Sequence, residues 1–495
     1  MHTDTDVIVV GAGPTGLMLA GELRLGGARV TVVERLPEPT GQSRGLGFTA
    51  RAMEIFDQRG LHPRFGGLEP SPLGHFGGIR FDYTILEGAH FGARGVPQST
   101  TEQVLQDWAL DLGARVERGW EVVDVDDHGD SVETTLATPE GERVMSSAYL
   151  VGCDGGQSTV RKAVGIDFPG TPATRGMYLA DVVGGDLETR FLGERLPGGM
   201  VMAAPLREGI DRIIVAEHGT PAGDRGRTPD FSEVADAWQR ITGESIHHTT
   251  ATWVSSFTDA TRQAAQYRKG RVFVAGDAAH IHLPAGGQGL SVGVQDAANL
   301  GWKLAAAVRG WAPEGLLDTY HDERHPVGER LLMNTRAQGM IFLGGKEADP
   351  LRELFGELMA YEDVRRHLAG TVSHLDVRYR VGQGGHPLLG ARLPHTRLRA
   401  DGALIDTAAQ FHEAQGVLID LSGDTDLREL ATAWKERVAV VAAEPAGPET
   451  SSVLAEARAV LVRPDGYVAW VGADPGDEEP ATALRRWFGD PSAEA

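Results

Sequence analysis

The sequence predicts an α/β protein whose largest part is a parallel sheet, with an antiparallel-sheet domain inserted in it and a third domain at the C-terminal end. Two patterns lead to this fold class. Within residues 6–35, 148–170 and 272–304, apolar strands end at an acid or a glycine run and are followed by a helical pattern. Residues 175–268 instead alternate between apolar and polar side chains, as antiparallel strands do. The length of 495 residues also exceeds what one core usually serves.

Charge and cysteine content narrow the classes of partner. The net charge is −22, whereas nucleic acids and anionic membrane surfaces bind basic faces, so neither is expected as a partner. The single cysteine, Cys153, excludes an internal disulfide and a cysteine-rich zinc site. The first residues are acidic where a signal peptide is basic, and the apolar run from Val7 to Val10 is too short to span a bilayer. We therefore expect a cytoplasmic protein.

Residues 6–35 carry the sharpest motif: a strand, a glycine-rich turn, a helix and a second strand that ends at Glu34. The glycines stand at Gly11-x-Gly13-x-x-Gly16. In a Rossmann-like domain the first glycine allows a tight turn, the second lets a pyrophosphate approach the backbone, and the third packs the helix on the strand. The helix N-terminus then faces the phosphates, and the acid accepts from ribose hydroxyls. This motif predicts a dinucleotide site for either NAD or FAD.

A second strand tip favours FAD over NAD. The strand that begins at Val272 stops at Gly276-Asp277, and glycines recur at 286, 287 and 289 before a long helical pattern. FAD is the longer molecule, so its ribityl chain and ring can reach this distant segment, where Asp277 would accept from a ribityl hydroxyl. The helix beginning near Gly289 would aim its N–H groups at the pyrimidine edge of the ring, where negative charge collects on reduction.

A third strand, within residues 148–170, ends in an acid and two glycines and is followed by a helix. An Asp-Gly-Gly segment alone is usually only a turn. Together, however, residues 11–16, 154–161 and 276–289 resemble the three motifs of the class A flavoprotein aromatic hydroxylases, the relatives of para-hydroxybenzoate and phenol hydroxylase. The resemblance covers essentially the whole chain.

Further stretches make the resemblance more specific. They are similar to the bacterial hydroxylases that modify polycyclic aromatic polyketides, most closely the angucycline hydroxylases, with the rifampicin monooxygenases and anhydrotetracycline hydroxylases as cousins. The stretches include QSRGLGFTARAMEIFDQRG, VPQSTTEQVLQDWA, PGGMVMAAPL and LLDTYHDERHPVG.

The resemblance implies a set of FAD contacts along the chain. Arg44 would lie over the cofactor, Gln98 near the ribityl chain, and Val122 beside the adenine through its backbone. Asp154 belongs to a motif implicated in both FAD and NAD(P)H binding. The expected cofactor-binding residues are Gly11, Gly13, Pro14, Thr15, Gly16, Glu34, Arg35, Arg44, Gln98, Val122, Asp154, Asp277, Pro284, Gly287, Gly289, Leu290 and Ser291.

Position 291 departs from the pattern of the relatives. They commonly have Asn after a GQGL or GQGM segment, whereas this chain has Ser291. The change removes an amide hydrogen-bonding group beside the cofactor. Backbone N–H groups can still bind the flavin, so we expect FAD binding to be kept and the reactivity of the flavin to change.

Several polar side chains near these motifs also have ordinary structural interpretations. His280 and His282 form an H-x-H pattern, but no third ligand is evident nearby, so no metal is expected. We take His280 as structural and His282 as a residue facing the active site. Cys153 sits in an apolar strand and fits a small core residue better than a nucleophile. Arg161 either binds phosphate or holds local structure.

The resemblance divides the chain into an FAD-binding domain with a helical region, a sheet domain that covers the flavin, and a C-terminal domain. The last looks like the thioredoxin-like domain of the phenol hydroxylase branch, with a hairpin turn at Asp465-Gly466. It contains no cysteine and so fits a structural or oligomer-contact module, with which a homodimer is compatible. The expected ranges are 1–72, 98–174 and 269–390 for the FAD domain, 73–97 and 175–268 for the sheet domain, and 391–495 for the C-terminal domain.

Apolar residues of the sheet domain are candidates for a broad substrate pocket, although most of them fit the packing face of the sheet equally well. The sequence marks no residue as an obligatory catalytic base. The pocket candidates are Met177, Tyr178, Met200, Met202, Ile213 and Trp253, together with His282.

The resemblance implies an FAD-dependent monooxygenase of antibiotic biosynthesis. NADPH or NADH would reduce FAD, dioxygen would give a flavin hydroperoxide, and an electron-rich ring of a polycyclic aromatic polyketide would take up one oxygen. Baeyer–Villiger oxygen insertion, and hydroxylation of a tetracycline, anthracycline or rifamycin, are alternatives. A non-catalytic flavoprotein that binds an aromatic drug is an alternative of another class. A flavin halogenase is disfavoured because the chain lacks the Trp-x-Trp-x-x-Pro signature.

Overall fold

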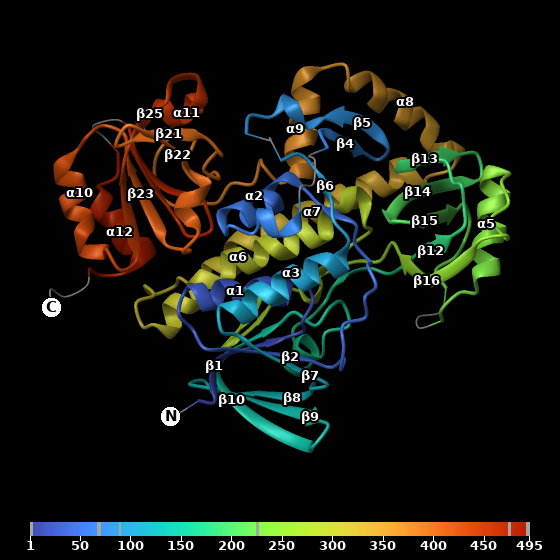
Figure 1. Cartoon of the computed structure of the whole chain (residues 1–495), viewed down its shortest axis with the longest axis horizontal. Helices are drawn as coiled ribbons and strands as arrows, with labels where there is room; N and C mark the ends of the chain where they lie inside the picture. The colour runs from blue at the N-terminus through green and yellow to red at the C-terminus, as the bar shows by residue number, and fades with distance from the viewer. Residues whose placement is uncertain (1–2, 67–70, 89–90, 224–226, 474–476, 492–495) are drawn as a thin grey trace.

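The computed structural model describes residues 3–66, 71–88, 91–223, 227–473 and 477–491. Its largest sheet has the strand order β18-β19-β10-β1-β2-β7, and a ribbon of β8 and β9 continues from β10 (Figure 1). Strands β19, β10, β1, β2 and β7 run parallel, as predicted. The strands are β1 (Thr5–Val10), β2 (Val30–Glu34), β7 (Arg115–Arg118), β8 (Glu121–Asp127), β9 (Val132–Thr138), β10 (Gly141–Gly152), β18 (Arg268–Lys269) and β19 (Val272–Val274).

The parallel strands end side by side. Val10 of β1 lies opposite both Val33 of β2 and Gly152 of β10, and Gly152 lies opposite Val274 of β19. In open parallel sheets, ligands bind beyond the carboxyl ends of the strands because the loops converge there. The acid- and glycine-bearing segments predicted at the strand tips therefore meet at one edge of the sheet.

Three helices pack together on this sheet. α1 (Pro14–Leu25) contacts both α3 (Gln98–Asp111) and α6 (Gln288–Val308), and the three share one buried core with the strands (Figure 1). The helix predicted near Gly289 is thus confirmed as α6. α7 (Thr319–Leu343) follows and contacts α6, in the region expected to be helical.

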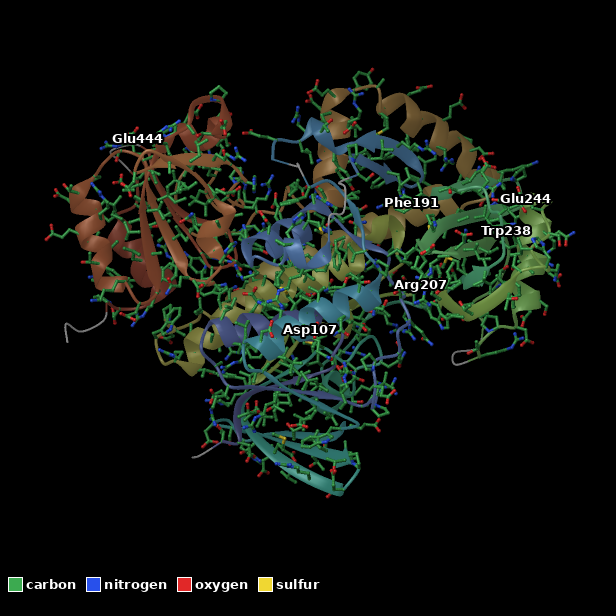
Figure 2. All side chains as sticks on the ribbon, viewed as in Figure 1. Asp107, Phe191, Arg207, Trp238, Glu244 and Glu444 are labelled. Atoms are coloured by element: carbon green, nitrogen blue, oxygen red, sulfur yellow. The ribbon has the colours of Figure 1, made fainter. Side chains whose placement is uncertain are left out.

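The inserted sheet is antiparallel, with the order β13-β14-β15-β12-β16. This confirms the strands predicted within residues 175–268. A helix, α5 (Phe231–Thr242), covers one face, and its Trp238 lies against the sheet (Figure 2). Asp230 and Glu233 form a capping box, a sequence pattern that indicates where α5 begins. The strands are β12 (Gly176–Val183), β13 (Arg190–Leu196), β14 (Gly199–Arg207), β15 (Ile210–Glu217) and β16 (Thr250–Thr258).

The segment 73–97 does not pair with the inserted sheet among the described residues, and its expected place in the domain that contains this sheet stays a prediction. β4 (Leu73–Phe76) and β5 (Ile79–Asp82) form a separate hairpin. Apolar residues of the hairpin share a buried cluster with α7 and α9 (Glu362–Ser373). The helices bury the apolar side chains of the hairpin, so the hairpin needs no pairing with a further strand. β6 (Arg94–Gly95) pairs with β3 (Gly47–Phe48), and α8 (Asp349–Leu358) links α7 to α9.

The C-terminal part forms its own sheet, with the order β24-β23-β26-β27 and with α10 and α12 beside it (Figure 1). Leu388 packs in its core, so the packing begins before the predicted boundary at 391. The predicted hairpin is confirmed, with Gly466 at φ +80° in the turn. The thioredoxin-like assignment stays a prediction. The elements are β21 (Arg397–Ala400), β22 (Ala403–Asp406), β23 (Gly416–Asp420), α10 (Thr425–Ala431), β24 (Val438–Ala442), β25 (Glu444–Pro445), α11 (Ser452–Ala455), β26 (Ala459–Val462), β27 (Val468–Gly472) and α12 (Pro480–Phe488).

Short elements connect these parts. A small sheet is made of β11 (Gly170–Thr171), β17 (Thr261–Gln263) and β20 (His280–Ile281). β11 and β17 flank the inserted sheet in the chain order, and β20 follows β19. α2 (Ala50–Gln58) contacts α6, and α4 (Thr159–Ala163) follows β10. Within the described ranges, no helix has the length and apolar character that crossing a membrane requires.

Candidate functional site

Glu34 ends β2, and its carboxylate is held by two backbone N–H groups. Oε2 accepts from Ala12 at 2.9 Å and Oε1 accepts from Leu36 at 2.9 Å. Ala12 stands between the first two glycines of the motif, so the acid and the glycine turn are fixed relative to each other. The backbone N–H of Trp120 donates to the Glu34 carbonyl at 3.0 Å, which brings the start of β8, with Val122, to the same edge.

The glycine turn has the geometry that its spacing predicts. Gly11 has φ +106°, which favours glycine, and a Cβ added to Gly16 would lie 2.0 Å from the Gly11 carbonyl oxygen. The tight turn and the close helix–strand packing are therefore confirmed. A Cβ added to Gly13 would meet nothing within 4 Å, so there is open space beside it. Pro14 is the first residue of α1.

Thr15 joins the glycine turn to the second strand tip. Its Oγ1 would lie 2.6 Å from a Cβ added to Gly276 and 2.2 Å from one added to Gly293. Any larger residue at these positions would separate α1, α6 and the turn after β19. The two motifs found far apart in the sequence therefore form one continuous site.

Asp277 is exposed at the tip of β19. Neighbouring protein desolvates the carboxylate and raises its pKa, although His280 and Arg44 oppose the shift. Arg44 is thus within electrostatic reach of Asp277. An exposed acid beside an exposed arginine is available to an incoming polar ligand. The predicted contacts that are exposed at this edge are Arg35, Arg44, Asp277, Pro284 and Gly287.

Asp296 on α6 fixes the turn beneath Asp277. Its Oδ2 accepts from the Gly276 backbone at 3.0 Å and pairs with Nε2 of His280 at 2.8 Å, while its Oδ1 accepts from Arg324 at 2.7 Å. Burial alone would raise the pKa of Asp296, but Arg324 and His280 hold it below its usual value. The structural interpretation of His280 is therefore confirmed.

Three segments distant in sequence meet around Arg44. Gln98 begins α3, and its Oε1 accepts from the Gly45 backbone at 3.1 Å. A Cβ added to Gly45 would lie 2.3 Å from the side chain of Leu290 on α6. Gln98 and Leu290 thus both lie against Gly45, the residue that follows Arg44.

Asp154 and Arg161 both serve local structure. One carboxylate oxygen of Asp154 accepts from the first two backbone N–H groups of α4, at 2.7 and 3.1 Å. The other has no hydrogen-bond partner in the part of the chain that the structure describes. Arg161 donates to the Ala278 carbonyl at 2.8 Å and lies over the ring of Phe168. The structural alternative for Arg161 is therefore favoured over phosphate binding.

Ser291 lies near the start of α6 with its hydroxyl directed at protein. Its Oγ accepts from the Thr49 backbone at 2.9 Å. Nε2 of Gln295 donates to the Ser291 carbonyl at 3.0 Å and lies 3.2 Å from Nδ1 of His374. All four residues are buried. The segment beside the helix start is thus supported by a polar cluster made of Thr49, Ser291, Gln295 and His374.

The family is decided by two matches that together span most of the chain. A family model described as an FAD binding domain matches residues 4–335, and one described as the C-terminal part of aromatic-ring hydroxylases matches residues 386–491. The chain belongs to the FAD-dependent aromatic-ring hydroxylases.

Individual relatives agree with this hydroxylase family over nearly the full length. The 12-dehydrotetracycline 5-monooxygenase/anhydrotetracycline 6-monooxygenase of Streptomyces rimosus is 43% identical, covering 98% of this chain and 99% of that protein. The rifampicin monooxygenase of Streptomyces venezuelae is 44% identical, covering 99% of both chains. The crystal structure of CabE, an aromatic hydroxylase from angucycline biosynthesis, is 57% identical with a TM-score of 0.95, covering 99% of this chain and 100% of that one.

FAD is the cofactor of the hydroxylase, and the strand-tip site fits it. The fitting observations are the open space at Gly13, the oriented carboxylate of Glu34 and the exposed Asp277 beside Arg44. The first backbone N–H groups of a helix have no partner within it, so those at the start of α1 and α6 can bind the anionic parts of the cofactor.

The pocket candidates lie on opposite faces of the inserted sheet. Tyr178 and Ile213 pack on the face that α5 covers, with Trp238. Their expected place in a substrate pocket is therefore corrected. Residues one position along a strand point to the opposite face, and there Met177 and Met200 share a buried cluster with Phe342 of α7. Met202 and Trp253 lie on this second face by strand alternation and register.

His282 lies beside the start of α6. Its Nδ1 donates to the Leu283 carbonyl at 2.7 Å, and its Nε2 would lie 3.4 Å from a Cβ added to Gly289. Burial, together with the charge of His280, lowers the pKa of His282 to about 4. The ring is therefore neutral near pH 7, with the lone pair of Nε2 available as an acceptor.

Sequence reasoning missed the side chains that support this site from other elements. Arg212 of the inserted sheet pairs with Asp181 at 2.7 Å, donates to the Ser43 carbonyl and lies 5.2 Å from the ring centre of Trp253. It therefore ties the sheet to the segment next to Arg44. These partners come from separate strands and loops, and no local spacing links them. Asp296 lies in a mainly apolar helix. A charged residue in such a helix is buried only when it is paired, so its position was the one signal in the sequence for a buried partner.

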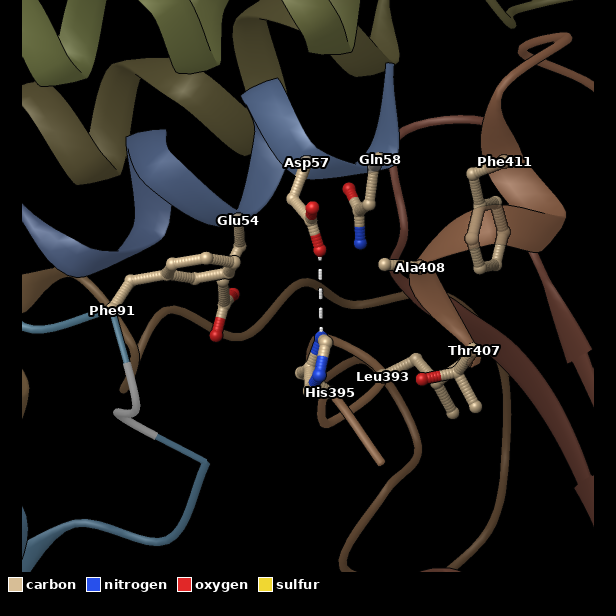
Figure 3. A pocket seen from close by; sticks show the side chains of 9 residues that line it. All are labelled: Glu54, Asp57, Gln58, Phe91, Leu393, His395, Thr407, Ala408 and Phe411. Atoms are coloured by element: carbon tan, nitrogen blue, oxygen red, sulfur yellow. Dashed lines mark ion pairs between the residues drawn. The ribbon is translucent and has the colours of Figure 1, made fainter. Parts of the chain in front are cut away.

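A separate cluster of ligand-type side chains lies between α2 and the C-terminal domain (Figure 3). His395 faces Asp57 at 3.6 Å and Asp406 at 3.1 Å. Burial would lower the pKa of His395, but hydrogen bonds with Asp406 and Asp57 raise it to about 9. A protonated ring between two carboxylates is already paired, so we interpret the cluster as an interdomain ion pair.

Proposed function

We propose that this enzyme hydroxylates an angucycline-type polycyclic aromatic polyketide and consumes NADPH in doing so. The observation that carries the proposal is the near-full-length likeness to CabE, an aromatic hydroxylase from angucycline biosynthesis. The monooxygenases of tetracycline and rifampicin that the chain also matches act on other polycyclic compounds, which supports the substrate class at a coarser level.

We propose that the strand-tip residues hold FAD along its length. The turn at Gly11, Gly13 and Gly16 binds the pyrophosphate, and Glu34 accepts from the adenosine ribose. Asp277 accepts from the ribityl chain. The remaining contacts proposed are Pro14, Thr15, Arg35, Arg44, Gln98, Val122, Asp154, Pro284, Gly287, Gly289, Leu290 and Ser291.

Bound FAD, once reduced, supplies the activated oxygen from dioxygen; the residues of the chain position the substrate and exclude water. The apolar face of the inserted sheet is suited to a flat aromatic substrate because Met177 and Met200 share a buried apolar cluster with Phe342. We propose that Met202 and Trp253 extend this surface. A methionine-rich surface can adapt its shape to a large ring system.

His282 is proposed to hold the substrate hydroxyl. Because Nδ1 donates to the Leu283 carbonyl, Nε2 is left as the acceptor for a phenolic O–H. Its low pKa makes it an orienting group rather than a strong base. We assign no general base, because a phenol fused into a polycyclic quinone is acidic enough to react without one.

The test is mass spectrometry of products formed by purified protein, NADPH and labelled dioxygen. The panel contains angucycline, anthracycline and tetracycline precursors with a free phenol. We expect NADPH oxidation to be slow alone and to rise several-fold with an angucycline phenol, whose product gains one labelled oxygen on a ring carbon. Omitting NADPH is the control.

Other outcomes separate the alternatives. Oxygen inserted between a ring carbon and a carbonyl carbon would indicate Baeyer–Villiger chemistry. Preference for a tetracycline or rifamycin would change the substrate class. Substrate binding without any NADPH oxidation would indicate a binding flavoprotein, and NADPH oxidation that yields only hydrogen peroxide with every substrate would overturn the hydroxylase proposal.

A further inference from the structure

Three buried amide side chains form a row between α7 and the start of α6. Asn334 and Gln338 stand one turn apart on α7, and Gln288 is the first residue of α6. Between 0 and 2% of the surface of each residue is exposed. Each amide brings donors and an acceptor into the interior, where an unpaired polar group is costly. We call these three residues the amide chain, and their partners decide what it holds.

The hydrogen bonds of the amide chain all run in one direction. The backbone N–H of Gly77 donates to Oε1 of Gln338 at 3.1 Å, and Nε2 of Gln338 donates to Oδ1 of Asn334 at 2.9 Å. Nδ2 of Asn334 donates to Oε1 of Gln288 at 3.1 Å. Nε2 of Gln288 donates to the Ala285 carbonyl at 2.9 Å. Because a backbone donor stands at one end and a backbone acceptor at the other, only this orientation of the three amides pairs all four links.

Each link of the amide chain depends on the next one. Hydrogen bonds in series polarise and strengthen one another in a buried, low-dielectric place. Removing one amide leaves a donor unpaired on one side and an acceptor unpaired on the other. A change in the middle of the chain is therefore felt at both of its ends, at Gly77 and at Ala285.

The α6 end of the amide chain fixes a glycine segment. Gly286 and Gly287 have φ of +71° and +66°, in the left-handed region. Glycines lose much conformational freedom when they are fixed, so such a segment needs support. A Cβ added to Gly286 would lie 3.2 Å from Nε2 of Gln288 and 3.7 Å from Oε1 of Gln338, which places the segment against the amides. Pro284 and Gly287, in contrast, are exposed.

The opposite end of the amide chain holds the hairpin of β4 and β5. Gly77 and Gly78 form the turn of this hairpin. A Cβ added to Gly78 would lie 2.6 Å from Cε2 of Phe342. Phe342 shares its buried cluster with Met177 and Met200 of the inserted sheet. The amide chain therefore links the segment before α6 to a hairpin that lies against the apolar cluster proposed to face the substrate.

We propose that Gln288, Asn334 and Gln338 are positioning residues that hold residues 284–287, and through them the flavin ring, at a fixed place relative to the apolar face of the inserted sheet. The inference rests on the proposed contacts of this segment with the flavin. The three amides are buried in protein and act through the backbone that they hold. Without the chain the segment adopts several conformations, and the affinity for FAD falls with the fraction that fits the ring.

The test compares Asn334→Leu and Gln338→Met with the wild type. Both changes keep most of the side-chain volume and remove the amide, the first in the middle of the chain and the second at the end away from α6. Thr335→Val is the matched control. Thr335 is equally buried on α7, and its hydroxyl donates to the Leu331 carbonyl of its own helix, so it lies outside the amide chain.

The readouts separate folding, the two ends of the chain, and the cofactor. The thermal midpoint reports folding. Hydrogen exchange of the apoprotein, followed on peptides 73–82 and 283–289, reports the hairpin turn and the segment before α6. Titration of the apoprotein with FAD and the visible spectrum of the bound FAD report the cofactor. None of them needs a substrate, so the result is independent of which compound the enzyme hydroxylates.

We expect both amide variants to fold with a lower thermal midpoint and to exchange faster in both peptides. They should bind FAD about 2- to 12-fold more weakly, the equivalent of one hydrogen bond, and shift the spectrum of the bound FAD. Faster exchange of residues 283–289 in Gln338→Met is the sharpest expectation, because this amide reaches the segment through Asn334. Thr335→Val should match the wild type in exchange and in both FAD readouts.

Wild-type exchange at residues 283–289 in a folded Gln338→Met protein would overturn the inference. Faster exchange with wild-type FAD affinity and spectrum would overturn it as well and leave the amides as structural residues. If Asn334→Leu does not fold, Gln338→Met decides alone. A failure of the wild type to bind FAD would instead overturn the cofactor site itself.

Discussion

The backbone N–H of Gly276 donates to Oδ2 of Asp296 at 3.0 Å, across 20 residues of sequence. This bond fixes the turn after β19 on α6 and so sets the direction in which Asp277 is presented. The carboxylate of Asp296 is itself held ionised by Arg324 and His280. The acid proposed to contact the cofactor therefore depends on a second, buried acid that makes no such contact.

Replacing Asp277 by Ala should weaken FAD binding by about 1.5–3 kcal/mol, the range for a hydrogen bond to a charged group. The turn should persist because Asp296 bonds to the backbone of Gly276 and not to the Asp277 side chain. Titration of the apoprotein with FAD measures the change. Asp277→Asn is the control, since it keeps an acceptor and should lose less. Equal affinity in wild type and Asp277→Ala would mean that this acid is not the ribityl ligand.

Ser291→Asn should leave FAD bound and change how the flavin reacts. The amide oxygen of Asn can accept from the Thr49 backbone as the serine hydroxyl does, while its NH₂ adds a donor next to His374. The measurement is the fraction of NADPH consumption that ends as hydrogen peroxide. Ser291→Ala is the control and should be destabilised by about 1–3 kcal/mol, because it leaves a buried N–H unpaired. An Asn variant identical to wild type in reduction rate and peroxide yield would contradict the expectation.

Cys153→Ser should keep turnover. Burial raises the pKa of the thiol well above its usual value, so it remains protonated and a poor nucleophile. Its Cβ would lie 3.3 Å from a Cβ added to Gly16, which shows a packing role against the glycine turn. A modest loss of thermal stability is expected, about 1–3 kcal/mol for a hydroxyl placed in an apolar site. Complete loss of activity in a folded, FAD-loaded variant would reopen a role for the thiol.

The His395 cluster should make stability depend on pH above neutrality. The folded pKa of about 9 exceeds the unfolded value of 6.5, so its contribution is full below about pH 6.5 and is lost as the pH rises through 9. After discounting for solvent screening, the contribution is on the order of 1–2 kcal/mol. Thermal midpoints of wild type and His395→Gln, measured from pH 6 to 10, test this. The two curves should converge at high pH, and parallel curves would refute the assignment.

Arg463→Met should loosen the C-terminal domain. Arg463 is buried and pairs with Glu323 of α7 and with Asp465 in its own hairpin turn. Removing it leaves both acids buried without their main partner, which typically costs about 3–5 kcal/mol. The exposed pair of Arg397 and Glu449 provides the control, since Arg397→Met should change stability by less than about 1 kcal/mol. Limited proteolysis and the thermal midpoint measure both, and equal effects of the two changes would contradict the prediction.

The motifs at the strand ends could be predicted from the sequence because each of them spans only a few residues. The spacing of Gly11, Gly13 and Gly16 predicts a tight turn between a strand and a helix. The apolar strand before Asp277 predicts that this acid lies at the end of a strand. Parallel strands then bring such tips to one edge by a general rule of sheet topology. For these reasons the sequence was sufficient to predict the parallel sheet, a helix beginning near Gly289 and an FAD site.

Other features depended on the tertiary structure. Alternation along β12 and β15 could not tell which face meets the site, because both faces are buried, one by α5 and the other by α7 and the segment before α6. Tyr178 and Ile213 are as apolar as Met177, and only the packing separates them. The sequence indicated only a turn at Asp465, whereas the fold places its carboxylate against Asn299 of α6 and Arg463.

The sequence by itself determined the class of fold, the FAD motifs and the likeness to aromatic hydroxylases, since these follow from short-range spacing and from strands that end in glycine and acid. Only the tertiary structure decided which buried groups support the cofactor. Gln295 lies on α6 and His374 directly follows α9, 79 residues further along the chain. Their hydrogen bond arises from the packing of distant segments, whose geometry no local pattern encodes, so it became visible only in the folded chain.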